Sequence, residues 1–182
     1  MKDKTRKLAL LAILTVIAII LQALPIKLGY FQGALFLIPV IIASILAGSA
    51  AGGIVGFASS LVILFNGDAM FYFQYNALFT ILTVVAKCTL AGVGAGYIYK
   101  VFKSKYTATA LASISAPIIN TGIFILASYV FFRPLIEGNY GKGFWTALVA
   151  MIGINFAIEL AVCIILSPAI ASIISFSSKQ GT

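Results

Sequence analysis

The sequence contains few charged residues. Only 9% of its 182 residues are Asp, Glu, Lys or Arg, whereas 62% are hydrophobic and the mean hydropathy is +1.14. Soluble domains carry about 25% charged residues on average, so this composition excludes an ordinary soluble domain. The apolar runs are long and continuous, without the polar alternation of β-barrel strands. We therefore predict an all-α integral membrane protein that lies in a lipid bilayer.

Histidine is absent, and cysteine occurs only as Cys88 and Cys163, each inside an apolar run. Because there is no C-x-x-C pair or histidine cluster, we expect no metal site and interpret both cysteines as packing residues. No G-x-x-x-x-G-K-[ST] motif is present, so the chain cannot hydrolyse ATP through a P-loop. With only four acidic residues, a lipid-modifying enzyme is also disfavoured. We expect no enzymatic activity and no cofactor.

The sequence also lacks a hydrophilic segment long enough to fold alone, which predicts a single transmembrane domain over residues 1–182. The first apolar run follows a basic start, but no small-residue cleavage site follows it, so we predict a retained helix rather than a signal peptide. No inverted repeat is evident, which argues against a self-sufficient secondary transporter built from two halves.

Six apolar runs approach the length of about 20 residues that a spanning helix needs. They cover residues 8–24, 31–47, 51–65, 77–99, 107–132 and 144–174. Clustered glycines at 48–53 predict a break between the second and third runs, which are short and irregular or strongly tilted. Six spans with cytoplasmic termini place eight of the twelve basic residues inside, as the positive-inside rule requires. The net charge of +8 thus indicates topology rather than nucleic-acid binding.

Polar residues inside these runs are functional candidates, because lipid supplies no hydrogen bonds. Lys87, Asn120, Asn155 and Glu159 occupy similar depths on the last three spans, and Asn155 and Glu159 share one helix face. Pro117 tends to bend the helix that carries Asn120. These residues predict a substrate pocket. The alternatives are an internal Lys87–Glu159 ion pair and an interhelical hydrogen bond from Asn120.

The predicted outer loops are rich in aromatic and amide residues, which suits a lid over a small polar ligand. An aromatic belt at the membrane interface is the alternative. The glycine-rich residues 133–143 could move as a gate. From the first and third-to-fourth connections we add five candidate substrate-binding residues: Tyr30, Gln32, Gln74, Tyr75 and Asn76.

Small residues gather on two helices. Ala9, Ala12 and Thr15 fall near one face of the first run, and Gly92 and Gly96 have G-x-x-x-G spacing in the fourth. Small residues let another helix approach closely, so these faces could pack against a partner helix, but they do not identify it.

Several motifs together resemble the substrate-binding S component of an energy-coupling factor (ECF) vitamin transporter. The resemblance extends over nearly the whole chain in span count and motif order, and Pro-x-x-Asn-Thr-Gly is its most specific part. The motifs are Lys7-Leu-Ala-Leu-Leu-Ala12, Pro39 on the short second helix, the glycines of 48–53, Lys87-x4-Gly92-x3-Gly96-x2-Tyr99-Lys100 and Ala116-Pro-Ile-Ile-Asn-Thr-Gly122.

The resemblance implies a six-helix, multi-pass protein of the bacterial cell membrane that binds a vitamin with high affinity. Its implied partners are a transmembrane coupling protein and two cytoplasmic ATPases, with Ala9, Ala12 and Thr15 as the docking surface on the first helix. The polar residues favour pantothenate weakly, while lipoate, pyridoxine and hydroxymethylpyrimidine remain open. The alternative function is a small channel or assembly subunit without a vitamin ligand.

Overall fold

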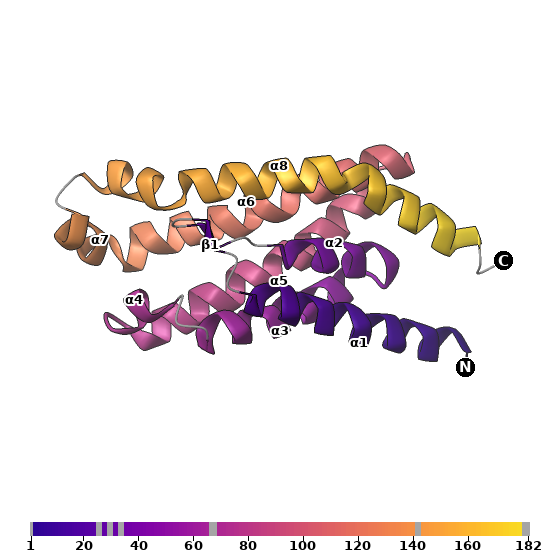
Figure 1. The fold of residues 1–182 in the computed structure, drawn as a ribbon, viewed down its shortest axis with the longest axis horizontal. Helices are drawn as coiled ribbons and strands as arrows, with labels where there is room; N and C mark the ends of the chain where they lie inside the picture. The colour runs from indigo at the N-terminus through magenta and orange to yellow at the C-terminus, as the bar shows by residue number, and fades with distance from the viewer. Residues whose placement is uncertain are drawn as a thin grey trace.

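A computed structural model describes residues 2–24, 27–28, 31–32, 35–65, 69–140 and 143–179 of the chain. Long helices run side by side along one axis, and both termini lie at the same end of the bundle (Figure 1). The elements are α1 (Lys2–Ala23), β1 (Lys27–Leu28), β2 (Phe31–Gln32), α2 (Leu37–Leu46), α3 (Ser49–Phe65), α4 (Met70–Phe73), α5 (Ala77–Val101), α6 (Lys105–Phe131), α7 (Arg133–Tyr140) and α8 (Phe144–Lys179).

The described part of the chain has four helices that are long and apolar enough to cross a membrane, namely α1, α5, α6 and α8. The shorter apolar helices α2 and α3 have 10 and 17 residues. The all-α prediction is confirmed, and the second and third helices are short as expected. Whether α2 and α3 complete a count of six spans remains a prediction.

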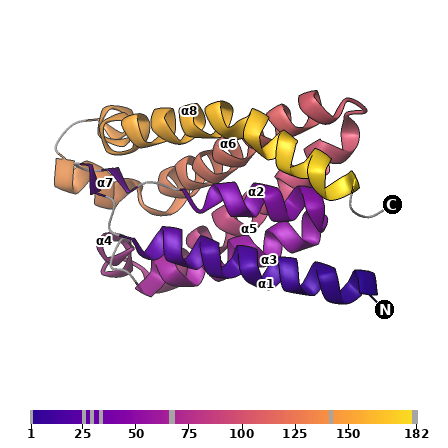
Figure 2. The same ribbon diagram turned by 45° about the vertical axis from the view of Figure 1, so that its right-hand side comes forward.

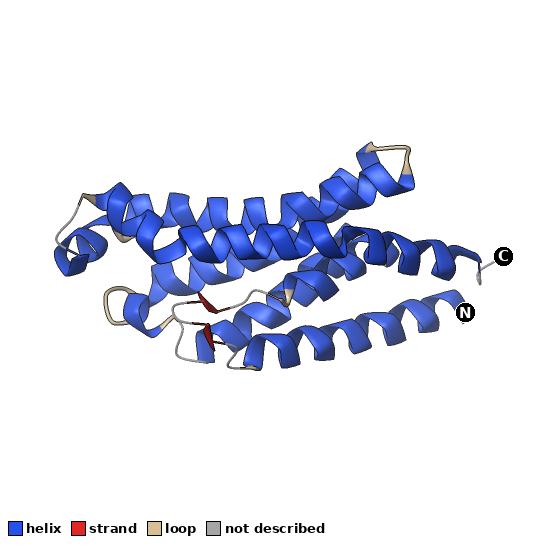
Figure 3. Cartoon of the chain, turned by 45° about the horizontal axis from the view of Figure 1, so that its top comes forward, coloured by secondary structure: helices blue, strands red, loops and turns tan. Residues whose placement is uncertain are grey.

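The predicted second helix over 31–47 is wrong in its first part. Phe31–Gln32 pairs antiparallel with Lys27–Leu28 as a short hairpin, visible as two red strands among the helices of Figure 3, and α2 begins only at Leu37. Pro39 explains the late start, because its ring and missing N–H are tolerated in the first turn of a helix but break the interior.

The predicted break between the second and third helices is present at Gly48, whose φ of 103° favours glycine. The other glycines of the cluster, Gly52 and Gly53, lie buried inside α3. A Cβ on Gly92 of α5 would meet the backbone of Gly52, and one on Gly56 would meet the backbone of Cys88. The glycine face of α5 therefore packs against α3 of the same chain.

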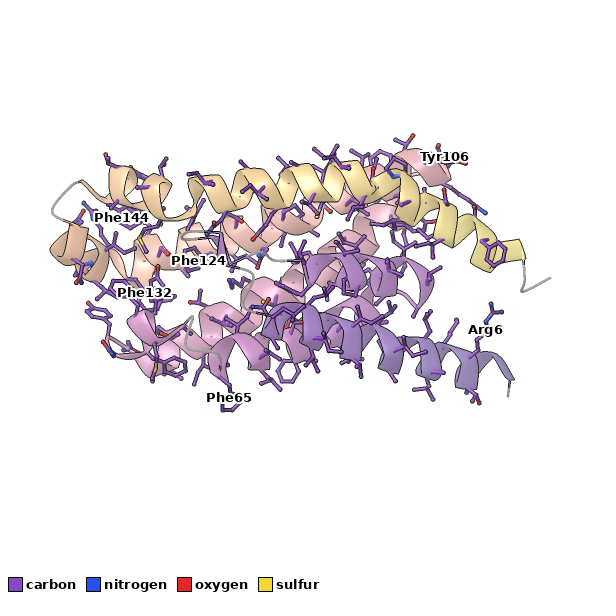
Figure 4. All side chains as sticks on the ribbon, viewed as in Figure 1. Arg6, Phe65, Tyr106, Phe124, Phe132 and Phe144 are labelled. Atoms are coloured by element: carbon purple, nitrogen blue, oxygen red, sulfur yellow. The ribbon has the colours of Figure 1, made fainter. Side chains whose placement is uncertain are left out.

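A buried hydrogen bond joins α2 to the same region. Ser44 Oγ donates to the backbone carbonyl of Gly92 at 2.6 Å. At the other end of the bundle, a separate apolar cluster centred on Phe132 and Phe144 joins the end of α6 to α7 and α8 (Figure 4). Helix packing thus joins the elements in both halves of the molecule.

Two prolines lie inside long helices. α6 remains helical through Pro117, and α8 contains Pro168. The C-terminal part of α8 runs at an angle to its N-terminal part in both Figure 1 and Figure 2, as a proline in a helix interior leads one to expect.

Candidate functional site

A cavity of about 190 Å³ lies among the helices, with walls from α1, α3, α4, α5, α6 and α8. Four of the residues predicted from the sequence line it together: Lys87 from α5, Asn120 from α6, and Asn155 and Glu159 from α8. The packing of α6 between α5 and α8 brings them together. The convergence at similar depth was expected, whereas a role in binding substrate remains a proposal.

Asn120 is 4% exposed and its side chain forms a hydrogen bond with the Glu159 carboxylate. One oxygen of each residue has no hydrogen-bond partner. Asn120 Oδ1 and Glu159 Oε2 are both buried and unsatisfied. Buried acceptors normally have a partner. Both acceptors belong to residues that line the cavity.

Lys87 does not form the direct ion pair with Glu159 that we considered as an alternative. A direct ion pair is found between Arg133 and Glu137, on α7. Lys87 interacts with Glu159 electrostatically, but its Nζ lies 5.3 Å from the centroid of the Phe124 ring, close enough for a cation–π contact. Phe124 and Phe132, both labelled in Figure 4, contribute apolar walls to the cavity.

Sequence reasoning missed several polar wall residues. Thr80 and Thr83 donate to backbone carbonyls of their own helix, at 2.8 and 2.7 Å, which leaves hydroxyl lone pairs available. Thr83 lies four residues and Thr80 seven residues before Lys87, so all three share one face of α5, and this spacing could have identified them. The remaining polar residues missed by the sequence are Gln22, Tyr72 and Thr121.

Those predicted lid residues that the structure describes, Gln74, Tyr75 and Asn76, do not line the cavity. Asn76 caps α5 by accepting a hydrogen bond from the Phe79 N–H at 3.1 Å. Gln74 and Tyr75 are exposed, and the Tyr75 ring packs edge-on against Phe132. Tyr30 and the side chain of Gln32 lie outside the described residues. Their role as a lid remains a prediction.

The predicted glycine-rich gate is largely helical, since α7 occupies Arg133–Tyr140. Arg133 Nε donates to Glu137 Oε1 at 3.0 Å across one turn, and this hydrogen bond raises the pKa of Arg133. Ile136 is fully buried and anchors the helix to the Phe132 cluster. The sequence placed this segment in an outer loop, but local pairing and a buried anchor favour a helix, and its movement as a gate remains a prediction.

The candidate docking residues lie on α1. Ala9 and Ala12 are exposed, whereas Thr15 is half-buried and donates to the Leu11 carbonyl at 2.7 Å. Large apolar side chains such as Ile13 and Val16 are exposed beside them. An apolar helix face of this kind suits lipid or another membrane helix.

No group of three or more His, Cys, Asp or Glu side chains that could hold a metal is found among the described residues. The fold and cavity define a class: a multi-pass helical membrane protein with a small cavity among its helices that several polar side chains line. Residues 6–171 match the family described as ECF transporter, substrate-specific component, and the chain belongs to this family. No curated protein and no solved structure matches the chain significantly.

Membership identifies the chain as a substrate-specific subunit of an ECF importer, which is a transport subunit and not an enzyme. The family also implies a small-molecule substrate and a complex with a coupling protein and ATPases. The resemblance drawn from the sequence motifs is confirmed.

Proposed function

We propose that the chain captures a small water-soluble vitamin or related micronutrient, with high affinity, in the cavity lined by Lys87, Asn120, Asn155 and Glu159. One observation carries this proposal. Two buried acceptors, Asn120 Oδ1 and Glu159 Oε2, remain without partners beside a cavity that also presents a cation. Buried polar atoms that lack partners are costly in a folded protein, and a bound ligand would offset that cost.

The size of the cavity limits the ligand. A volume of about 190 Å³ is below the range of about 300–1,000 Å³ typical of drug-sized ligands. Small vitamins fit this limit better than large ones. Pantothenate, lipoate, pyridoxine and hydroxymethylpyrimidine are the compounds we propose to test first, and pantothenate is the weak favourite from the sequence because its carboxylate would suit Lys87.

For the membrane arrangement we propose six spans, with α2 and α3 as the short pair and both termini in the cytoplasm of a bacterial cell. Several lines support it. Both termini lie at one end of the bundle (Figure 1), and Arg6 and Tyr106 lie at that same end (Figure 4). The basic residues of 100–105 lie where α5 ends and α6 begins, next to Tyr106. They are therefore on the same side of the membrane as the basic N-terminus, as the positive-inside rule favours.

Transport in this proposal draws its energy from partners. The chain has no P-loop, so we assign ATP hydrolysis to two cytoplasmic ATPases and force transmission to a transmembrane coupling protein. Ala9, Ala12 and Thr15 on α1 are the proposed docking surface. Small side chains there would let a helix of the coupling protein approach closely.

The proposal is tested by extracting small molecules from the purified protein and identifying them by mass spectrometry. Isothermal titration calorimetry with the four vitamins follows, and we expect saturable one-to-one binding of one compound. A protein that carries no co-purified molecule and binds nothing across a wider vitamin panel would instead be a channel or an assembly subunit.

A further inference from the structure

The cavity holds one basic and one acidic side chain, so its formal charges balance. Among the described residues that line it, Lys87 is the basic residue and Glu159 the acidic residue, and the others are neither Lys or Arg nor Asp or Glu. The two groups interact through the cavity without forming a direct ion pair. In a site surrounded by helices a net charge is poorly solvated, so a ligand that preserves this balance binds at lower cost than one that breaks it.

Two side-chain acceptors at the cavity lack a hydrogen-bond partner. Asn120 uses its side chain in the hydrogen bond with Glu159, and its Oδ1 is left without a donor, as is Glu159 Oε2. The hydroxyl groups of Thr80 and Thr83 already donate to backbone carbonyls. A ligand would therefore need N–H or O–H groups to bind this part of the wall. It would also need an acceptor, because the Lys87 ammonium can only donate.

A carboxylate ligand fits this wall poorly. Pairing with Lys87 would bring a second carboxylate near Glu159, and the cavity would then hold an excess negative charge. Two like charges in one poorly solvated site disfavour each other. Phe124, beneath the Lys87 ammonium, offers an apolar face on which a flat ring could lie instead.

We infer that the ligand is a ring compound with no net charge, whose N–H or O–H donors bind Glu159 Oε2 and Asn120 Oδ1 and whose acceptor faces Lys87. The inference rests on the proposed function and narrows it. It favours hydroxymethylpyrimidine and pyridoxine, which are donor-rich heterocycles, over the carboxylates pantothenate and lipoate.

The test measures binding of these four compounds to the purified full-length protein by calorimetry at pH 7.5. We expect saturable binding of hydroxymethylpyrimidine or pyridoxine, with pantothenate and lipoate at least 100-fold weaker. Glu159→Gln should weaken the uncharged ligand tenfold or more. It should also strengthen pantothenate relative to the wild type, because the cavity then carries a net positive charge. This shift of specificity is not expected from a purely structural Glu159.

Glu137→Gln on α7 is the matched control, since Glu137 pairs with Arg133 outside the cavity, and it should leave all four affinities unchanged. If Glu159→Gln does not fold, the wild-type comparison alone still decides. Tight wild-type binding of pantothenate or lipoate, or an anionic co-purified molecule, would overturn the inference and leave the proposed function standing. Binding of no compound at all, with nothing co-purified, would overturn both.

Discussion

Asn120 combines two features that are rarely found together in a membrane helix: nearly complete burial and an unused acceptor. Its side chain bonds to Glu159, which fixes the orientation of both groups. Its Oδ1 has no hydrogen-bond partner, and the residue lines the cavity. A purely structural asparagine would be expected to satisfy both ends of its carboxamide through neighbouring helices. The unsatisfied oxygen therefore supports the proposed role of Asn120 in binding a ligand.

We predict that Asn120→Ala weakens ligand binding by more than about 1 kcal/mol while the fold survives, because one hydrogen bond to the ligand is lost. Calorimetry with the ligand identified by mass spectrometry measures this change. Asn139→Ala is the matched control, since the Asn139 side chain donates to the Leu135 carbonyl on exposed α7. Wild-type affinity in a folded Asn120→Ala protein would remove Asn120 from the site.

At the residue scale, the sequence predicted the two charged residues and the two asparagines of the site, but we did not identify its hydroxyl groups. Lys87, Asn120 and Glu159 stand out because such groups are costly in lipid. Thr80 and Thr83 do not, because a threonine can satisfy its proton on its own helix, as both do here. Asn76 also caps α5, as an amide next to a helix start often does, and its part in binding substrate remains a prediction.

Close packing of α3 against α5 is the main interaction at the scale of elements. Glycines on both helices meet, and a methyl group on Gly56 or Gly92 would reach the backbone of the partner helix. Neither backbone can move without displacing its helix. Because α5 also carries Lys87, Thr80 and Thr83, this packing sets the position of one wall of the cavity.

We predict that Gly56→Ala lowers the stability of the protein by about 1–3 kcal/mol, the usual cost of overpacking. Thermal unfolding of the protein in detergent, with and without ligand, reports the change. Gly122→Ala in α6 provides the control, because a Cβ there meets nothing within 4 Å. Gly122→Ala should be neutral or slightly stabilising, since alanine favours a helix. Equal stability of the two variants would show that α3 and α5 are not in close contact.

The ends of helices were predicted well where one type of residue determines them, and poorly where two sequence signals favour different structures. The break at Gly48 follows from glycine alone, and it was predicted. The hairpin at Phe31–Gln32 was not, because apolar content favours a helix while Pro39 restricts it to a later start. For α7, glycines in the sequence suggested a loop, but the burial of Ile136 depends on contacts that only the folded chain reveals.

At the scale of the whole molecule, the ends of the bundle differ in charge. The termini and the α5–α6 connection gather basic residues at one end, and the aromatic cluster around Phe132 and Phe144 lies at the other (Figure 4). The proposed orientation puts the basic end in the cytoplasm, in agreement with the positive-inside rule. In this orientation the ligand would enter from the α4 and α7 end.

Cysteine labelling can test this orientation with little background, because both native cysteines are buried. We predict that Gly138→Cys on α7 reacts with a membrane-impermeant maleimide in intact cells. Ser104→Cys, between α5 and α6, should react only after the membrane is opened. Both positions are exposed, so differences in reactivity report the side of the membrane. The reverse pattern would invert the topology, and labelling of both in intact cells would contradict a crossing by α6.

The exposed face of α1 is the place where the whole chain would meet its coupling protein. We predict that Ala12→Leu impairs vitamin uptake by cells several-fold, while the purified variant binds the vitamin as the wild type does. The added side chain would hold a partner helix away from α1, but it would not reach the cavity. Ala161→Leu is the matched control, because Ala161 is also exposed but lies on α8, away from the proposed surface. Co-purification of the coupling protein with each variant separates docking from transport. If Ala12→Leu and Ala161→Leu both retain the coupling protein and normal uptake, the α1 face is lipid-facing and docking occurs elsewhere.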